Sequence, residues 1–141
     1  MKKIIIINGP NLNLLGEREV ELYGTKTLKE IEKECCEIFK HDKLSLNFFQ
    51  SNSESEIIDK IHICKNYDGM IINAGAFTHT SIAIHDALKI VKIPKIELHI
   101  SNIYNREEFR KNSFISPVVN GIIAGFVTQV YQVAINALKY L

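Results

Sequence analysis

The feature that most constrains the fold is a run of four isoleucines, Ile4–Ile7, which leads directly into a loop of Asn, Gly and Pro at residues 8–16. An uninterrupted apolar run of β-branched residues that ends in turn-forming residues predicts a strand covered on both faces. Strands of that kind belong to parallel sheets flanked by helices. In such sheets ligands bind beyond the carboxyl ends of the strands, so this loop lies where a small polar ligand would bind.

Short apolar runs alternate with amphipathic stretches along the rest of the chain, which is the pattern of βαβ units. Strands are predicted at 3–8, 44–50, 69–73, 95–100 and 121–124. Because parallel crossovers are right-handed, these elements predict an α/β fold. It is a flavodoxin-like, doubly wound, five-stranded parallel sheet with helices on both faces.

The helices are predicted from capping residues and apolar spacing. Thr27 with Glu30 and Ser53 with Glu56 form capping-box pairs at the starts of two helices. Two more helices are expected at about 80–88 and 128–141. Apolar stripes run along the first and last of the four, at Leu28, Ile31, Cys35 and Ile38, and at Val130, Ala134, Ala137 and Leu141.

Composition narrows the function classes. The 141 residues fit one domain, 1–141, and the net charge of +1 with no dense basic run predicts neither a nucleic-acid nor a membrane partner. No apolar run approaches the roughly 20 residues of a membrane span. The chain has three cysteines, Cys35, Cys36 and Cys64, without C-x-x-C spacing. They indicate neither a disulfide framework nor a zinc site, and they fit a reducing cytoplasm. Cys35 and Cys36 are expected to pack as small hydrophobic residues.

Polar side chains follow several of the predicted strands. Because parallel strands end at one edge of the sheet, these groups should converge there and form a small polar pocket. They are Asn11, Arg18 and Tyr23 after the first strand, residues 73–81 (Asn-Ala-Gly-Ala-Phe-Thr-His-Thr-Ser) after the third, and Glu97, His99, Ser101 and Asn102 at the end of the fourth, with Arg106 and Arg110 beyond.

Glu97 and His99 are two residues apart on a strand, so they point to one face. A carboxylate beside an imidazole fixes its tautomer and favours its protonated form, which makes a general acid. The alternative is a hydrogen-bonded histidine in a buried layer. The polar loops around the pair favour the acid.

Tyr23 is the candidate base. A phenol is mostly protonated at neutral pH, so it acts as a base only if an adjacent cation stabilises the phenolate. Arg18 and Arg106 are the candidate cations. The spacing alone favours the alternative, an exposed loop tyrosine that packs over a ligand.

Several residues near these loops have open alternatives. His79 is either a ligand donor or a solvated residue, and Arg110 either pairs with the adjacent glutamates or binds a carboxylate. Asp86 is a solvated helix residue unless its face meets another subunit. The N-cap of the third helix is Thr78, Thr80 or Ser81.

Other chemistries lack their sequence signatures. No G-x-G-x-x-G, G-x-x-x-x-G-K-[ST] or G-x-S-x-G motif occurs, so nucleotides and serine hydrolysis are not indicated. The spacing of His79, His85, Glu97 and His99 does not favour a metal site. No lysine lies in the convergent loops to form a Schiff base.

Four motifs together resemble the type II 3-dehydroquinate dehydratases. They are Asn8–Glu19 (NGPNLNLLGERE) with Tyr23-Gly24, residues 73–81 (NAGAFTHTS), residues 96–102 (IELHISN), and residues 106–110 (REEFR) with Ser116-Pro117. They occur in order along nearly the whole chain. The resemblance implies a flavodoxin-like fold, a dodecamer built from trimers, and no cofactor. It also implies the lyase reaction of the shikimate pathway of aromatic amino-acid biosynthesis, reversible anti elimination of water from 3-dehydroquinate to 3-dehydroshikimate through an enolate.

The resemblance also implies residue roles. Tyr23 removes the proton alpha to the ketone, Arg18 lies on a lid that closes the site, and Asn11 holds a water that stabilises the enolate. His99, oriented by Glu97, protonates the leaving hydroxyl. The implied substrate-binding residues are Asn73, His79 and Arg110 for the hydroxyls and ring, Ile100 and Ser101 for the carboxylate, and Asp86 from a neighbouring subunit.

Two departures from the family pattern carry expectations. Val20 stands where the family usually has proline, which predicts a more mobile lid. His85 replaces an arginine and predicts that oligomer or site stability varies with pH near neutrality. The competing hypotheses are a non-catalytic, flavodoxin-like protein that binds a small carboxylate, and a flavodoxin-like domain that binds FMN.

Overall fold

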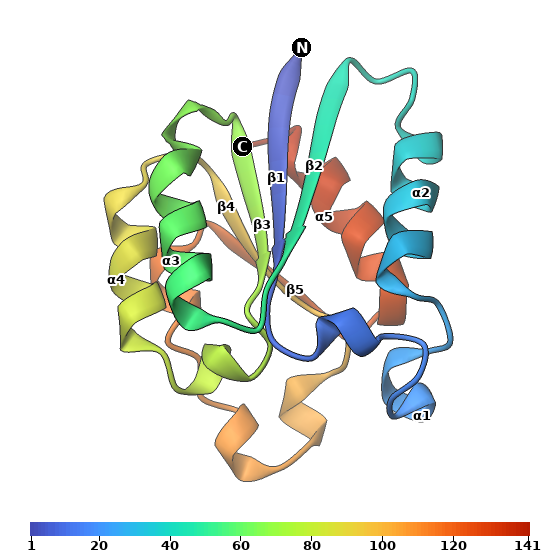
Figure 1. The fold of residues 1–141 in the computed structure, drawn as a ribbon, viewed down its shortest axis with the longest axis vertical. Helices are drawn as coiled ribbons and strands as arrows, with labels where there is room; N and C mark the ends of the chain where they lie inside the picture. The colour runs from blue at the N-terminus through green and yellow to red at the C-terminus, as the bar shows by residue number, and fades with distance from the viewer.

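A computed structural model describes residues 1–141 and contains one five-stranded sheet, in which every neighbouring pair of strands is parallel (Figure 1). The strand order is β2-β1-β3-β4-β5. The strands are β1 (Lys2–Asn8), β2 (Leu44–Gln50), β3 (Gly69–Asn73), β4 (Lys95–His99) and β5 (Gly121–Ala124). The predicted architecture is confirmed. β1 begins one residue early and β4 ends at His99, so Ile100 already lies in the following loop.

Helices cover both faces of the sheet (Figure 1). They are α1 (Val20–Tyr23), α2 (Leu28–Ile38), α3 (Glu54–His62), α4 (Ile82–Ile90) and α5 (Val130–Leu138). Ile4 and Ile6 of β1 belong to the apolar cluster that includes α2 and α5, whereas Ile5 and Ile7 belong to the cluster of α3 and α4. Alternate side chains of a strand point to opposite faces, so one isoleucine run anchors both layers. None of the helices is long and apolar enough to cross a membrane.

The predicted capping residues begin their helices. The hydroxyl of Thr27 accepts the backbone N–H of Glu30 (3.2 Å), and the hydroxyl of Ser53 accepts that of Glu56 (3.3 Å). For the third predicted helix the N-cap is Ser81, whose hydroxyl accepts from the N–H of Ile84 (2.9 Å). That helix, α4, therefore runs from 82 to 90 and not from 80 to 88.

Three packing predictions are wrong. Cys36 and Ile38 are exposed on α2, because consecutive helix positions are about 100° apart and the core side of α2 is already occupied by Cys35 and Phe39. Leu141 is also exposed, because α5 ends at Leu138 and the predicted apolar stripe does not continue beyond that residue. The core side of α5 consists of Val130, Tyr131, Ala134, Ile135 and Leu138.

The loops after β1 and β3 pass each other backbone to backbone. The N–H of Gly9 donates to the carbonyl of Asn73 (2.7 Å). A Cβ at Gly9 would lie 2.4 Å from the carbonyl oxygen of Ala74. This contact fixes the floor of the space beyond the carboxyl ends of the strands, between α1 and the irregular segment 100–118 (Figure 1).

Candidate active site

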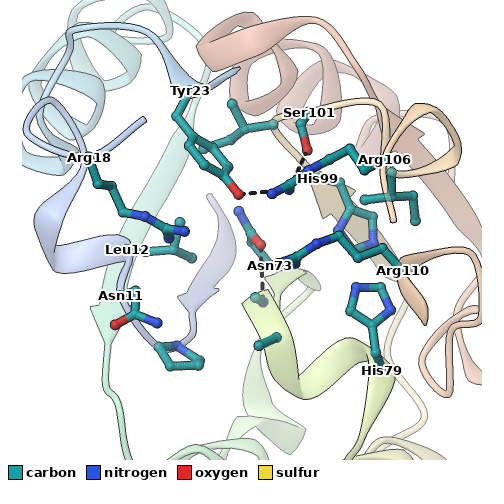
Figure 2. A pocket seen from close by; sticks show the side chains of 15 residues that line it. Asn11, Leu12, Arg18, Tyr23, Asn73, His79, His99, Ser101, Arg106 and Arg110 are labelled. Atoms are coloured by element: carbon teal, nitrogen blue, oxygen red, sulfur yellow. Dashed lines mark hydrogen bonds between the residues drawn. The ribbon is translucent and has the colours of Figure 1, made fainter. Parts of the chain in front are cut away.

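A cavity of about 110 Å³ lies beyond the carboxyl ends of β1, β3 and β4, where the sequence predicts the ligand (Figure 2). Fifteen residues line it, and among them are nine of the predicted site residues: Asn11, Arg18, Tyr23, Asn73, His79, His99, Ile100, Ser101 and Arg110. Arg106 also lines it. Two predicted site residues, Glu97 and Asp86, do not line the cavity. Glu97 is buried next to His99, and Asp86 lies on α4, which contributes no residue to the cavity.

Glu97 and His99 form a buried pair on β4. The Nε2 atom of His99 lies 2.6 Å from Oε2 of Glu97. Glu97 is 1% exposed and His99 is 5% exposed. Burial raises the pKa of Glu97, but hydrogen bonds from His99 and from the hydroxyls of Ser116 and Ser113 hold that pKa below its usual range. An ionised carboxylate only accepts hydrogen bonds. Nε2 of His99 therefore carries a hydrogen, and Nδ1 is the nitrogen left for a ligand.

Tyr23 lies at the end of α1 and is 8% exposed, so the expectation of an exposed loop tyrosine is wrong. The short helix α1 turns the chain back and sets the phenol between two arginines (Figure 2). Nη1 of Arg106 donates to the phenol oxygen at 2.8 Å, and the guanidinium of Arg18 lies 4.7 Å from the ring centroid. Arg106 is therefore the adjacent cation that a phenol needs if it is to act as a base.

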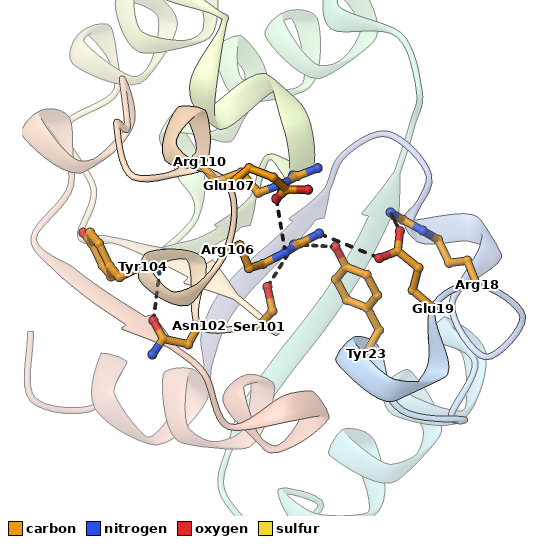
Figure 3. Close-up of polar contacts among 9 residues, drawn as sticks. All are labelled: Arg18, Glu19, Tyr23, Ser101, Asn102, Tyr104, Arg106, Glu107 and Arg110. Carbon is orange, nitrogen blue, oxygen red and sulfur yellow. Dashed lines mark hydrogen bonds and ion pairs between the residues drawn. The ribbon is translucent and has the colours of Figure 1, made fainter.

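Arg106 is the residue whose importance the sequence understated. It is one of two candidate neighbours of Tyr23 in the sequence, yet the motif assigns it no role. Its Nη1 also donates to the hydroxyl of Ser101 at 3.1 Å, so one guanidinium joins the loop after β4 to α1 (Figure 3). The available signal is its place beside Arg110 in a segment that follows a polar strand end.

Two glutamates surround the arginines (Figure 3). Glu19 pairs with Arg18 (3.3 Å) and Arg106 (3.8 Å), and Glu107 pairs with Arg106 (3.8 Å) and Arg110 (2.7 Å). Arg110 thus pairs with an adjacent glutamate, one of its two predicted alternatives, while it also lines the cavity. The glutamates are half exposed, and exposed ion pairs are weak, so an anionic ligand can compete for these guanidinium groups.

Asn73 is held by a buried network that the sequence did not indicate. Its Oδ1 accepts the N–H of Gly75 (3.3 Å), and its Nδ2 donates to the hydroxyl of Tyr131 (3.4 Å). Tyr131 in turn donates to Oδ1 of Asn8 (2.6 Å). Burial raises the pKa of Tyr131, which stays protonated and serves as a donor. The network fixes which way the Asn73 amide faces.

His79 points toward the cavity, which favours the ligand donor over the solvated residue (Figure 2). Its Nδ1 donates to the carbonyl of Asn112 at 2.8 Å, and its ring lies 6.4 Å from that of His99, nearly parallel to it. Burial lowers the pKa of His79 despite the hydrogen bond to Asn112. The ring is therefore neutral near pH 7 and presents Nε2 as an acceptor.

Asp86 is exposed on α4 and does not line the cavity of its own chain. The adjacent His85 donates from Nδ1 to the carbonyl of Phe114 at 2.6 Å, and its predicted effect on pH-dependent stability stays a prediction. No group of three His, Cys, Asp or Glu side chains is arranged to hold a metal ion.

Fold and site together define a flavodoxin-like α/β protein whose small polar cavity holds an arginine-bound phenol and a carboxylate-bound imidazole. The family model described as dehydroquinase class II matches residues 2–139, and the chain belongs to this family. Two relatives, both named 3-dehydroquinate dehydratase, come from Caldicellulosiruptor saccharolyticus (57% identical, covering 99% of this chain and 97% of the relative) and Prochlorococcus marinus strain MIT 9301 (55%, 98% and 95%). The crystal structure of a type II dehydroquinase from Butyrivibrio crossotus superposes with a TM-score of 0.95 at 46% identity, covering 98% of this chain and 97% of that one.

Proposed function

We propose that this protein is a type II 3-dehydroquinate dehydratase, which eliminates water from 3-dehydroquinate through an enolate to give 3-dehydroshikimate, reversibly and in the anti sense. The observation that carries the proposal is the hydrogen bond from Arg106 to the oxygen of Tyr23, in a cavity that is also lined by His99 with the buried Glu97 as its partner. The names of the relatives at 55–57% identity support the substrate. In this role the enzyme serves the shikimate pathway of aromatic amino-acid biosynthesis.

The first step is proton abstraction. The phenolate of Tyr23 takes the proton alpha to the ketone, and the electron pair of the broken C–H bond becomes the enolate. Arg106 stabilises the phenolate before the transfer, while the guanidinium of Arg18 lies over the ring. Asn11, whose backbone is fixed by a hydrogen bond from its N–H to Asn52 (2.9 Å), holds the water that stabilises the enolate oxygen.

The second step is loss of the hydroxyl. As the enolate collapses, the C–O bond breaks and protonated His99 delivers its proton to the departing oxygen, so that water leaves. Glu97 stays ionised and stabilises the imidazolium before transfer. The base and the acid lie on different elements, α1 and β4, which suits an elimination from opposite faces of a ring.

Substrate binding uses the remaining polar groups. Ile100 and Ser101 offer backbone N–H groups to the substrate carboxylate, and Ser101 adds its hydroxyl. The ring hydroxyls are bound by Asn73, His79 and Arg110. The guanidinium of Arg110 exchanges part of its pairing with Glu107 for the ligand.

The proposal includes a homo-oligomer, a dodecamer built from trimers, in which Asp86 reaches the site of a neighbouring subunit. The exposed face of α4 supports it. Ile82 and Ile90 are 59% and 67% exposed and lie one helical turn on either side of Asp86. Exposed isoleucines at that spacing are expected at a subunit contact.

The proposal also takes residues 1–141 as one catalytic domain in the cytoplasm. A single sheet with an apolar cluster on each face supports the first part. The three unpaired cysteines support a reducing compartment.

The test is the growth of conjugated-enone absorbance when purified protein is mixed with 3-dehydroquinate. Tyr23→Phe and His99→Ala should each abolish most turnover while keeping the fold, whereas Tyr104→Phe, an exposed tyrosine outside the cavity lining, should not. Borohydride treatment should leave the activity unchanged, because no lysine lines the cavity.

The alternatives have distinct outcomes in the same assay. A folded wild type that binds 3-dehydroquinate without forming the enone would be a carboxylate-binding protein. The presence of both Tyr23 and His99 in the cavity does not favour this alternative. A yellow purified protein would indicate FMN. A Tyr23→Phe variant of near-full activity would contradict the assignment of the base.

A further inference from the structure

The segment 112–116 supplies two hydroxyls to one buried carboxylate of β4. Ser113 donates to Oε2 of Glu97 at 2.7 Å, and Ser116 donates to Oε1. With Nε2 of His99, Glu97 has three donors while only 1% of it is exposed. An ionised carboxylate in such a site is costly without them.

The hydroxyl of Ser113 has no freedom to turn away. Its oxygen accepts the backbone N–H groups of Ile115 and Ser116, each at 3.0 Å. A hydroxyl has one hydrogen and two acceptor positions, so the hydrogen is left for Glu97. The hydroxyl of Ser116 has Glu97 as its one hydrogen-bond partner. Both hydroxyls are thus committed to this carboxylate.

We propose that Ser113 and Ser116 are positioning residues for proton transfer, which hold Glu97 oriented and charged and so set how tightly His99 holds its proton. The inference rests on the proposed function, because it assigns His99 as the acid. Neither serine lines the cavity, so their effect passes through Glu97.

The direction of the effect follows from charge. The Glu97–His99 pair is net neutral when the imidazole is protonated and net negative after the proton leaves. Hydroxyl donors stabilise negative charge, so they favour the deprotonated pair and make His99 a stronger acid. Loss of one hydroxyl should make the pair hold its proton more tightly and slow the delivery of that proton.

Other charged groups around the pair stay constant in such an experiment. His79 faces His99 from the neighbouring loop, and the remaining titratable or charged groups of the cavity are Arg18, Tyr23, Arg106 and Arg110. None of them forms a hydrogen bond with Ser116, whose hydroxyl bonds only to Glu97, so a change at this hydroxyl reports on Glu97.

The experiment compares Ser116→Ala with Ser116→Thr, which keeps the hydroxyl, and with Ser55→Ala, an exposed serine on α3, as the remote control. For Ser116→Ala we expect kcat to fall about tenfold, as for one hydrogen bond to a charged group, with KM nearly unchanged. The basic limb of the kcat profile should move up by about one pH unit, since tenfold in proton affinity is one unit. Ser116→Thr should recover most of the loss.

A second readout is the ring ¹⁵N titration of His99 by NMR, which needs no turnover. Its midpoint should rise in Ser116→Ala and return toward wild type in Ser116→Thr. A loss of kcat with an unmoved pH profile and an unmoved His99 midpoint would overturn the proposal and leave Ser116 a packing contact. If the wild type itself fails to convert 3-dehydroquinate, the proposed function fails, and the NMR titration still decides the role of Ser116. If Ser116→Ala fails to fold, Ser116→Cys, a weaker donor, carries the same comparison.

Discussion

At the scale of single residues, the two groups proposed as base and acid have partners of opposite charge. The phenol oxygen of Tyr23 accepts a hydrogen bond from the guanidinium of Arg106. The imidazole of His99 donates from Nε2 to the carboxylate of Glu97. A cationic partner suits a group that takes a proton and an anionic partner suits one that gives a proton, so these contacts support the proposed division of roles.

Because the guanidinium of Arg106 contacts both Tyr23 and Ser101, we predict that lysine cannot replace this arginine. Arg106→Lys should lower kcat roughly 10–100-fold, because one ammonium on a flexible stem does not reproduce the contact to both Tyr23 and Ser101. The acid limb of the kcat profile should move to higher pH, since the phenolate loses its donor. Lys111→Ala is the control, because that lysine pairs only with Glu108 at the surface. An unmoved acid limb would contradict the role of Arg106.

His79 predicts a pH dependence of stability. Burial lowers its pKa in the folded state, so below about pH 6.5, the value for an unperturbed histidine, the unfolded chain takes up a proton that the folded chain resists. The free energy of unfolding should therefore fall as pH drops from 7 to 5, and His79→Gln should reduce that slope. Urea unfolding at several pH values measures it. His62→Gln, at an exposed histidine of α3, should keep the wild-type slope, and a His79→Gln slope equal to wild type would refute the prediction.

At the scale of elements, the sheet was predictable because its signal is local. The isoleucine run and the capping residues Thr27 and Ser53 follow rules that act within a few residues. The site was predictable only where a rule of the same kind applies, as for Glu97 and His99 on one strand face. Arg106 meets Tyr23 across 83 positions of sequence through an irregular segment, and no periodic pattern places such a contact. The buried Tyr131 network was missed for the same reason.

The crossing of the loops after β1 and β3 predicts that Gly9 tolerates no side chain. A Cβ there would meet the backbone of Ala74, which cannot move aside as a side chain can. Gly9→Ala should lower the free energy of unfolding by about 1–3 kcal/mol, as overpacking does. The matched control is Gly121→Ala on β5, where a Cβ meets nothing within 4 Å. Denaturant unfolding of the two variants measures the difference, and equal stabilities would contradict the prediction.

Val20 predicts a mobile lid. It is the first residue of α1, a position that favours proline, and the residue is 45% exposed. Val20→Pro should therefore protect residues 17–24 from limited proteolysis, because it reduces the number of open conformations. The rate of cleavage in this segment is the measurement, with Val133→Ala on α5 as an exposed-valine control. Equal cleavage rates in wild type and Val20→Pro would refute it.

At the scale of the whole molecule, the cavity of one chain is lined by Tyr23, His99 and most of the proposed binding groups, but Asp86 lies outside it. The exposed isoleucines on either side of Asp86 make that face of α4 apolar, so covering it with another subunit would remove apolar surface from water. In the proposed closed ring of identical subunits, that face is covered in every copy. In the proposed assembly each site therefore combines Tyr23 and His99 of one subunit with Asp86 of the next.

A shared site predicts that two inactive variants can restore each other. Tyr23→Phe and Asp86→Ala should each be nearly inactive alone, and after dissociation and reassembly in equal amounts about a quarter of the sites should hold both intact residues, if subunits mix at random in a ring. The control mixture is Tyr23→Phe with His99→Ala, whose residues lie in the cavity of one chain, so mixing restores no site. Subunit exchange is followed with a mass-tagged copy. Full exchange without recovered activity would mean that Asp86 acts within its own chain or not at all, and recovery in the control mixture would show that Tyr23 and His99 do not share a chain.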